Sequence, residues 1–452
     1  MANFHPRAPI KYTKILCDRN LRVAHTSASE FDTAEVVVAI THKNQPQGLI
    51  RALDSALKQS LTQKQIARIV VLDDSSDISW ASEASALLHH PAVTLLQAEC
   101  GSPARARNLL LDWADTQPCI QWVARLDADD ELFAKDSLHG LWKAVRDTDK
   151  VAALGSNKLR KGGVILQNDN IANPNELCNH LSLAGFIDNF ASAKQQRELP
   201  SCNLLLKNNL GIRYPNIRSA EDHWLVTKLL MLNPSKVAVC SYPIYAIYSL
   251  DGEDTKTNKS NEIWQDQRNR LAYVARTWST LLSTNRHLLG VGMEGAVWLQ
   301  HNQVVKEFYP WAISDTEVRS LRTLLAEKDL PISTVTWRKC DGLWQYSTSF
   351  QNNALTNEKL SEKSIVDYLK KLYHAGVCTL NIKRDNLIVT PQGDLEYIDV
   401  GKDLQPLTSS RFRDMCARLY SIGIVANTDE EVVRRLSWRR QDDALMSLPG
   451  FE

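Results

Sequence analysis

The segment Trp122–Leu132 has the sequence WVARLDADDEL, in which an apolar run ends in a dense cluster of carboxylates. The apolar run predicts a buried strand, and a turn directly after it would place the oxygens of Asp127 and Asp129 at the carboxyl end of the sheet. Open α/β folds bind their ligands at that edge. Oxygen ligands of this kind suit Mg²⁺ or Mn²⁺, which share their remaining positions with water and with phosphate groups of a substrate. The alternative is a solvated acidic turn without a ligand.

The composition is that of an ordinary globular protein that is large enough for two domains. The chain has 452 residues, of which 44% are hydrophobic and 23% are charged, and a single core rarely extends over so many residues. Lys and Arg (53 residues) almost balance Asp and Glu (52 residues), which gives a formal net charge of +1. This balance argues against a chain that coats nucleic acid, and we expect no nucleic-acid partner.

Neither a signal peptide nor a transmembrane segment is recognisable in the sequence. Residues 1–33 show no clear periodicity and are predicted to be an N-terminal extension. They lack the apolar core of a signal peptide, and no later run approaches the roughly eighteen apolar residues that a spanning helix needs. The nine cysteines form no CxxC pair, which favours free thiols in a reducing compartment over a disulfide framework. We therefore predict a cytoplasmic protein, with peripheral attachment to the inner face of the membrane as a second option.

The first half alternates predicted strands and helices in the manner of a parallel sheet. A β-branched run at 35–40 is followed by apolar residues at helical spacing over 46–59 and by a second apolar run at 69–72. Strand, helix and strand with short links form a βαβ unit. Arg105 and Arg107 lie in the first turns of a later helix. Because a helix N-terminus prefers anions, these arginines indicate an anionic ligand there, unless they only cover a solvated face.

Four short motifs follow one another in this half, and their order is informative. They are Thr41–Asn44 (THKN), Asp73–Ser76 (DDSS), Ala106–Asn108 (ARN) and Asp127–Asp130 (DADD). In this order they resemble the family 2 glycosyltransferases, which have the GT-A nucleotide-diphospho-sugar transferase fold. The resemblance covers residues 34–255 and implies an α/β domain with a mixed, mostly parallel sheet.

The resemblance implies a metal-dependent transfer of a sugar from a nucleoside diphosphate sugar, with a UDP-sugar favoured. Asp222 would act as general base toward the acceptor hydroxyl, although an acidic pair at a helix start, here Glu221 and Asp222, is also ordinary N-terminal capping. Asp129 and Asp127 would hold Mn²⁺ or Mg²⁺. The residues expected to bind the nucleotide sugar are Thr41, Asn44, Asp74, Arg107 (or Arg105) and Asp127.

Two motifs found in relatives are missing from the sequence. Near Tyr245–Gly252 the chain lacks the Tyr-Arg-x-His sequence with which many relatives close over the diphosphate, so the closing loop or the metal ligands would differ. The Gln-x-x-Arg-Trp motif of processive synthases is also absent, which favours the addition of a single sugar. We expect an inverting reaction, a carbohydrate, lipid-linked or peptide acceptor, and a role in bacterial surface glycan assembly. The donor sugar and the oligomeric state stay open.

The second half of the chain is predicted to contain a linker and a second domain. Residues 256–285 are predicted to form a helical linker, and residues 286–452 a smaller α+β domain. A Gly-x-Gly-x-x-Gly loop between two strands (Gly290–Gly295), Lys306 on the following strand and the later segments Tyr373–Val389 and Tyr397–Gly401 resemble the protein-kinase-like fold. The resemblance implies Glu317 as the helix partner of that lysine, and a nucleotide site for ATP that is made of Gly290, Gly292, Gly295, Lys306, Asn386 and Asp399.

At the position of the kinase catalytic base this half carries Asn381 in place of an aspartate, and the usual histidine is Thr379. An amide cannot accept a proton as a carboxylate does, and Asp385 is out of register. The sequence therefore predicts a pseudokinase with a scaffold, acceptor-binding or regulatory role. One alternative is an atypical kinase that phosphorylates a sugar, lipid or glycan, with the first half as its carbohydrate-binding partner. Another is a binding protein in which both halves have lost their chemistry.

Overall fold

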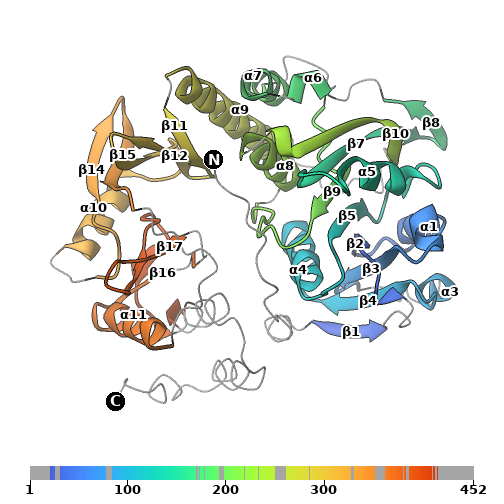
Figure 1. Ribbon diagram of the computed structural model, residues 1–452, viewed down its shortest axis with the longest axis horizontal. Helices are drawn as coiled ribbons and strands as arrows, with labels where there is room; N and C mark the ends of the chain where they lie inside the picture. Colours follow the sequence, from blue (N-terminus) through green and yellow to red (C-terminus); the bar gives the residue numbers. More distant parts are fainter. Residues whose placement is uncertain are drawn as a thin grey trace. The chain divides into compact units, whose positions relative to one another are not determined.

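The computed structural model divides the chain into two compact units, of which unit 1 ends at Ser283 and unit 2 begins at Thr284 (Figure 1). Residues 250–252, at the end of the segment that lacks the Tyr-Arg-x-His sequence, and Asp385 lie outside the described residues. Within the described ranges, no helix has both the length and the apolar composition that crossing a bilayer requires. The structure describes residues 21–25, 31–77, 84–168, 172, 174–177, 179–192, 198–217, 219–232, 234–249, 261–284, 286–326, 330–351, 362–379, 381–382, 386–409, 411–412 and 415.

Unit 1 is built on a ten-stranded sheet with the order β1-β4-β3-β2-β5-β9-β7-β10-β6, in which β8 pairs with β7. The block β4-β3-β2-β5 is parallel, as is the pair of β7 and β10, whereas β9 runs antiparallel between β5 and β7. The predicted mixed sheet of an α/β domain is therefore confirmed. Its strands are β1 (Arg22–His25), β2 (Val36–His42), β3 (Ala67–Asp74), β4 (Val93–Ala98), β5 (Trp122–Asp127), β6 (Glu131–Leu132), β7 (Ala152–Lys161), β8 (Val164–Gln167), β9 (Leu204–Lys207) and β10 (Val237–Ser249).

Helices cover both faces of this sheet. Successive residues of a strand point to opposite faces, and the strands β2 and β3 are buried along almost their whole length, so both faces need a cover. Val38 and Ile40 of β2 belong to the main hydrophobic core with α1, whereas Ala39 lies with Leu110 and Leu111 of α4 on the other face. A proline occupies the first turn of α1 and of α4, where its missing N–H has no helical partner to lose. The helices are α1 (Pro46–Leu57), α2 (Ser60–Gln63), α3 (Ser85–Leu88), α4 (Pro103–Asp115), α5 (Ser137–Val145), α6 (Pro174–Leu177), α7 (His180–Ala191), α8 (Glu221–Leu232) and α9 (Asn261–Ser283).

Two segments differ from the sequence prediction. The segment predicted as a linker forms α9, an integral helix of unit 1 whose Trp278 is fully buried. Arg268 of α9 donates to the carbonyl oxygen of Phe190 on α7 (2.7 Å). Arg276 of α9 pairs with Asp188, which also lies on α7 (2.7 Å). Within the predicted N-terminal extension, β1 joins the edge of the sheet beside β4. The side chains of β1 are mostly exposed, so this strand carries no apolar periodicity in the sequence.

Unit 2 contains a five-stranded antiparallel sheet with the order β11-β12-β13-β15-β14 and two separate strand pairs. The predicted glycine-rich loop joins β11 to β12, and the backbone N–H of Gly292 donates to the carbonyl of Gly295 (3.0 Å). A Cβ at Gly295 would clash with the carbonyl oxygen of Glu307 on β13, so strand pairing itself requires glycine there. The elements are β11 (His287–Val291), β12 (Gly295–Gln300), β13 (Gln303–Phe308), α10 (Asp315–Leu325), β14 (Thr336–Cys340), β15 (Leu343–Ser349), α11 (Glu362–His374), β16 (Val377–Thr379), β17 (Leu387–Val389), β18 (Leu395–Tyr397) and β19 (Leu404–Pro406).

Candidate active site

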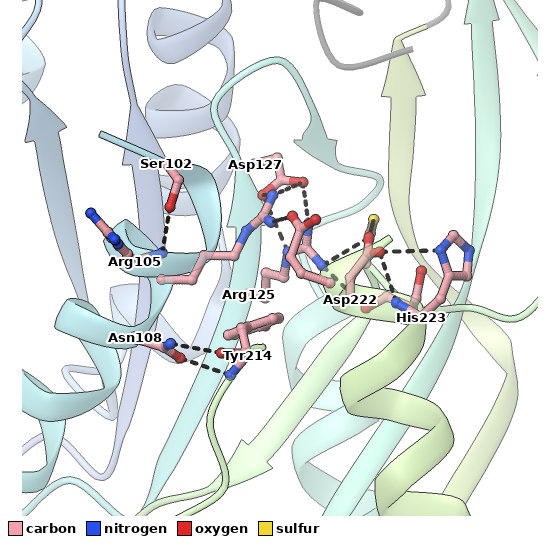
Figure 2. Close-up of polar contacts among 12 residues, drawn as sticks. Ser102, Arg105, Asn108, Arg125, Asp127, Tyr214, Asp222 and His223 are labelled. Atoms are coloured by element: carbon pink, nitrogen blue, oxygen red, sulfur yellow. Dashed lines mark hydrogen bonds and ion pairs between the residues drawn. The ribbon is translucent and has the colours of Figure 1, made fainter. Parts of the chain in front are cut away.

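Two arginines and three carboxylates form one connected cluster at the carboxyl end of β5 (Figure 2). Arg107 of α4 pairs with Asp127 (Nη2 to Oδ1, 3.1 Å) and with Glu221. Arg125 of β5 pairs with the other oxygen of Asp127 (2.6 Å) and with Asp222 (Nη1 to Oδ2, 3.3 Å). Asp127 is therefore held by both arginines, and Arg125 links it to Asp222. We call these five residues the arginine–carboxylate cluster.

Local structure explains why these side chains meet. Arg125 and Asp127 are two residues apart in an extended strand, so their side chains leave the same face, and Arg125 Nε also donates to Asp127 Oδ1 (3.2 Å). Glu221 and Asp222 are the first residues of α8, where negative charge is stabilised by the helix dipole. Ala220 directly before them has a φ of 62°, a left-handed conformation that turns the chain into the helix.

Asp222 contacts three residues, which are Arg125, Cys202 and His223. Its Oδ1 accepts the backbone N–H of His223 (2.8 Å) and lies 3.2 Å from Nδ1 of the same residue, and its Oδ2 accepts the thiol of Cys202 (3.1 Å). Burial alone would raise the pKa of Asp222, but His223, Arg125 and Arg107 together hold that pKa well below its usual range. The carboxylate is therefore ionised at neutral pH.

Asp130 differs in its surroundings from Asp127. Its side chain is buried and accepts the backbone N–H of Ser249 (3.2 Å), and burial together with Asp129 and Asp127 raises its pKa well above the usual range. The raised pKa favours the neutral form of Asp130, whereas Arg107 and Arg125 lower the pKa of Asp127 and favour its anion.

The residues fit a divalent cation only in part. Among the described residues, no three acidic, histidine or cysteine side chains are grouped closely enough to hold a metal ion by themselves. Both carboxylate oxygens of Asp127 accept hydrogen bonds from the two arginines, and a metal site at Asp127 and Asp129 stays a prediction. Two carboxylates suffice for Mg²⁺ or Mn²⁺ where substrate phosphates and water complete the shell.

The other residues predicted to bind the donor lie in different surroundings. Thr41 is the register partner of Asp127 on the neighbouring strand, so it lies at the same edge as the cluster. Asp74 accepts the backbone N–H groups of Cys100 (2.5 Å) and Gly101 (3.1 Å), which ties β3 to the loop before α4. Arg105 is exposed near the start of α4 and does not join the cluster (Figure 2).

Asn44 braces two loops in the structure. Its φ of 54° is left-handed, its Oδ1 accepts the backbone N–H of Asp77 (2.9 Å), and its Nδ2 donates to the carboxylate of the same residue (3.2 Å). The backbone N–H of Asn44 donates to Ser76 Oγ (2.9 Å). This residue therefore shapes the edge of the site by joining the loop after β2 to the loop after β3.

Three contributors to the site escaped sequence reasoning: Arg125, Tyr214 and Cys202. The ring of Tyr214 lies under both arginines, with guanidinium carbons 5.7 and 5.8 Å from its centroid, and Asn108 holds its backbone through two hydrogen bonds of 2.8 Å. A charged residue inside an apolar strand, two positions before Asp127, was a readable signal for Arg125. Tyr214 and Cys202 gave no comparable signal.

In unit 2, Lys306 and Asn386, two of the predicted nucleotide-site residues, contact Asp399. Its Oδ1 binds Lys306 Nζ (2.6 Å), and its Oδ2 accepts the side-chain amides of Asn386 (3.3 Å) and Asn381 (3.3 Å). Lys306 is buried, and burial alone would lower its pKa, but Asp399 and other neighbours raise it above the usual range. The position of the missing kinase base thus holds an amide that donates to Asp399.

The predicted partner of Lys306 was wrong. Glu317 is exposed and forms a capping box with Ser314 at the start of α10: the Ser314 hydroxyl accepts the Glu317 backbone N–H (3.2 Å), and the Glu317 carboxylate accepts the Ser314 N–H (2.7 Å). The second carboxylate near Lys306 is Glu294 of the glycine-rich loop, with Oε2 at 3.5 Å from Nζ. The carboxylate of Glu317 is already used to satisfy the open N–H groups of the helix start.

Part of unit 1 matches the model of a known protein family. Residues 37–195 match the family described as Glycosyl transferase family 2, which confirms the predicted family 2 glycosyltransferase domain over this range. This part of the chain is therefore similar to glycosyltransferases. The matched range contains Asp127 and Asp129, and Asp222 lies beyond it.

Parts of the chain are similar to solved structures at low sequence identity. S. aureus TarS 1–349 in complex with UDP-GlcNAc is 18% identical and aligns over 53% of this chain and 66% of that one, with a TM-score of 0.39. Mannosyltransferase PcManGT from Pyrobaculum calidifontis, in complex with GDP-Man and Mn²⁺, is 17% identical over 55% and 64% of the two chains, with a TM-score of 0.37. Mannosyl-3-phosphoglycerate synthase from Rubrobacter xylanophilus is 11% identical over 77% of this chain and 93% of that one, with a TM-score of 0.34. The alignment thus spans less than two thirds of the TarS fragment. No curated protein matches the chain in sequence.

Proposed function

We propose that unit 1 transfers a single sugar from a nucleoside diphosphate sugar to an acceptor hydroxyl, with inversion at the anomeric carbon. The observation that carries this proposal is the link from Asp127 through Arg125 to Asp222. It brings a donor-side carboxylate and the ionised carboxylate of Asp222 into one cluster at the carboxyl edge of the sheet, where ligands bind in open α/β folds. Carbohydrate, lipid-linked and peptide acceptors all offer the required hydroxyl.

On the donor side, Arg107 meets the diphosphate. Its guanidinium is shared between Asp127 and Glu221, and a diphosphate offers the same planar donor group a stronger, doubly charged partner. A divalent cation, which Asp129 and Asp127 would hold, supplies positive charge to the diphosphate leaving group. Thr41 lies beside Asp127 and would contact the nucleoside side of the donor.

On the acceptor side, Asp222 takes the proton of the attacking hydroxyl. The acceptor oxygen forms its bond to the anomeric carbon as the bond from that carbon to the diphosphate oxygen breaks, and the diphosphate leaves with the bonding electrons. Arg125 and His223 hold Asp222 as the anion. If Arg125 shifts from Asp222 toward the incoming diphosphate, the pKa of Asp222 rises and the carboxylate becomes a better base.

A thermal-shift and hydrolysis screen with the full chain tests this proposal. UDP-, GDP- and CDP-sugars are added with and without Mn²⁺, because a ligand that binds the folded state raises the melting temperature even without an acceptor. We expect one donor class to shift the wild-type protein in a metal-dependent way, and Asp129→Ala to lose the Mn²⁺-dependent part. The proposal fails if no nucleotide sugar shifts or is hydrolysed, or if Asp129→Ala responds as the wild type does.

For unit 2 we propose a kinase-like module that binds a nucleotide such as ATP and serves a regulatory or acceptor-binding role. Lys306 and Asn386 converge on Asp399, which supports a nucleotide site. Asn381 in place of the base supports binding over phosphoryl transfer, because its amide donates to Asp399 and cannot take a proton. Titration of the full chain with a fluorescent ATP analogue and Mg²⁺ tests the idea. Binding that is lost in Asp399→Asn is expected, and no binding to the wild type contradicts it.

A further inference from the structure

Unit 1 contains a second polar feature, a cavity of about 290 Å³ between β7, β10 and the segment before β9. Its polar wall includes Ser156, Asn157 and Asn168, and its apolar wall includes Pro200 and Ile244. The cavity shares no lining residue with the arginine–carboxylate cluster, and neither the family match nor the proposed chemistry assigns it a role.

An irregularity of strand pairing produces the cavity. Along β10, Cys240 pairs with Gly155 of β7, but the next paired residue is Ile244, opposite Ser156. Residues 241–243 of β10 therefore have no register partner on β7 and form a bulge in the strand. The hydroxyl of Ser156 donates to the carbonyl oxygen of Ser241 (2.8 Å), which ties the bulge to its neighbour. Bulges are frequent beside active sites because they open or redirect a sheet locally.

The cavity wall suits a neutral ligand that is rich in hydroxyl groups. Among its described lining residues there is no carboxylate, lysine, arginine or histidine, whereas the side chains of Asn157, Gln167 and Asn168 offer amide groups. Pro200 and Ile244 add apolar surface. A sugar ring has the matching combination, since its hydroxyls form hydrogen bonds and its C–H faces pack on apolar groups. A phosphate would find no cation there.

Buried amides support the polar wall from behind. Asn157 is 2% exposed, and its Oδ1 accepts Nδ2 of Asn168 (3.4 Å) and Nδ2 of Asn203 (3.4 Å). Asn203 is fully buried, and its Nδ2 also donates to the carbonyl oxygen of Gly155 (3.0 Å). Its Oδ1 has no hydrogen-bond partner among the described residues. Asn203 does not line the cavity, so its role is to hold Asn157 in place behind the polar wall.

One short segment connects the cavity to Asp222. Pro200 lines the cavity, the carbonyl oxygen of Ser201 accepts from Arg125 Nη1 (3.3 Å), and the thiol of Cys202 donates to Asp222 Oδ2 (3.1 Å). Two residues of extended chain span at most about 7 Å, so the cavity wall and the proposed base are close neighbours. The segment 200–203 thus contacts the cavity on one side and the arginine–carboxylate cluster on the other.

We propose that this cavity binds a neutral sugar ring of the acceptor and so presents an acceptor hydroxyl to Asp222. The inference rests on the proposed glycosyl transfer and deepens it, because it narrows the acceptor from any hydroxyl compound to a carbohydrate or a molecule that carries one. The amides of Asn157 and Asn168 would select the ring by its hydroxyls.

Ligand-observed NMR on the full chain tests the cavity, with methyl glycosides of glucose, galactose, mannose and N-acetylglucosamine as probes. We expect saturation transfer to at least one glycoside, and affinity about tenfold weaker in Asn157→Ala, the loss typical of a hydrogen bond in a binding site. Gln97→Ala removes an exposed amide of β4 in the same sheet and should bind as the wild type does. Donor hydrolysis should stay within about twofold in Gln97→Ala, because Gln97 lies neither in the cluster nor in the cavity wall.

A second pair of variants guards against a folding defect in Asn157→Ala. Cys240 lines the cavity, so Cys240→Phe should fill it and abolish glycoside binding, whereas Cys240→Ser should preserve binding at a similar melting temperature. The inference is overturned if the wild type hydrolyses a nucleotide sugar but binds none of the glycosides, or if Cys240→Phe binds them normally. If donor hydrolysis is absent and glycoside binding is lost in Cys240→Phe, the proposed function fails while the carbohydrate cavity stands.

Discussion

Arg125 Nη1 lies 3.3 Å from Asp222 Oδ2, although the two residues are 97 positions apart in the chain. The same guanidinium binds Asp127, so the strand that ends in the acidic turn and the start of α8 share one cation. This bridge fixes the spacing between the donor side and the acceptor side of the proposed site. It also means that one substitution disturbs both sides at once.

Arg125→Met should therefore destabilise unit 1 severely. The side chains of Arg125, Asp127 and Asp222 are 7%, 18% and 13% exposed, and removal of one partner from a buried ion pair costs about 3–5 kcal/mol. Arg105→Met is the matched control, since that arginine is exposed on α4, and should change stability by less than about 0.5 kcal/mol. Urea unfolding of the two variants provides the measurement. Equal midpoints would show that the cluster contributes nothing to the fold.

Asp222→Asn should separate chemistry from donor binding. The amide keeps the shape of the side chain and can still accept a hydrogen bond but cannot take the acceptor proton, so we expect kcat to fall by about 10²–10⁴ with little change in the KM of the donor. Steady-state transfer or hydrolysis of the donor found in the screen provides both constants. Asp54→Asn, on the exposed surface of α1, should leave them unchanged. An Asp222→Asn enzyme with wild-type kcat would assign the base role elsewhere.

The sequence was sufficient for the parts of the site that one strand and its turn define. Thr41 lies near the end of β2, and Asp127 is the last residue of β5. The parallel register of these strands brings the two residues together. The bridge from Arg125 to Asp222 could not be predicted, because it depends on how α8 packs beside β5 after a long excursion of the chain. Glu317 is a different case: the Ser314–Glu317 spacing is that of a capping box, so the sequence already contained the reason why this carboxylate does not reach Lys306.

His42 should make unit 1 sensitive to mild acid. Its side chain is buried beside Asp73, its register partner, and burial lowers the pKa of His42 to about 4 although Asp73 acts in the opposite direction. Below the unfolded pKa of about 6.5, the unfolded chain takes up a proton that the folded chain refuses until about pH 4. Stability is therefore lost as the pH falls through this window, by up to about 3 kcal/mol in total at 1.36 kcal/mol per pKa unit.

Urea unfolding at pH 7 and pH 4.5 checks this expectation by difference. His42→Gln should lose less stability than the wild type between the two values, because the variant has no imidazole to protonate. His89→Gln, which removes an exposed imidazole, should follow the wild type. An identical pH dependence in all three proteins would contradict a buried neutral His42.

The native carboxylate of Glu294 should weaken the binding of a nucleotide to unit 2. Its carboxylate lies 3.5 Å from Lys306 Nζ and competes with an incoming phosphate for that cation. Glu294→Gln removes the competing charge, so we expect the fluorescent ATP analogue to bind about three- to tenfold more tightly, a gain on the scale of a partly exposed charge pair. Glu317→Gln, an exposed carboxylate that does not contact Lys306, should not tighten binding. Unchanged or weaker affinity in Glu294→Gln would show that this carboxylate does not compete for the site.

Gly295 and Gly290 should respond in opposite ways to the same substitution. Gly295→Ala would place a Cβ against the carbonyl oxygen of Glu307, whereas a Cβ at Gly290 has no atom within 4 Å. Overpacking of this kind typically costs about 1–3 kcal/mol, and Gly295→Ala must separate β12 from β13 to relieve it. Gly290→Ala should be neutral or slightly stabilising, since it restricts the unfolded chain. Hydrogen exchange of the β12 and β13 amides in the full chain distinguishes the two, with faster exchange expected only in Gly295→Ala. Equal protection in both variants would mean that the strand pairing tolerates a side chain at this position, and the glycine would then need another explanation, such as close approach of a phosphate.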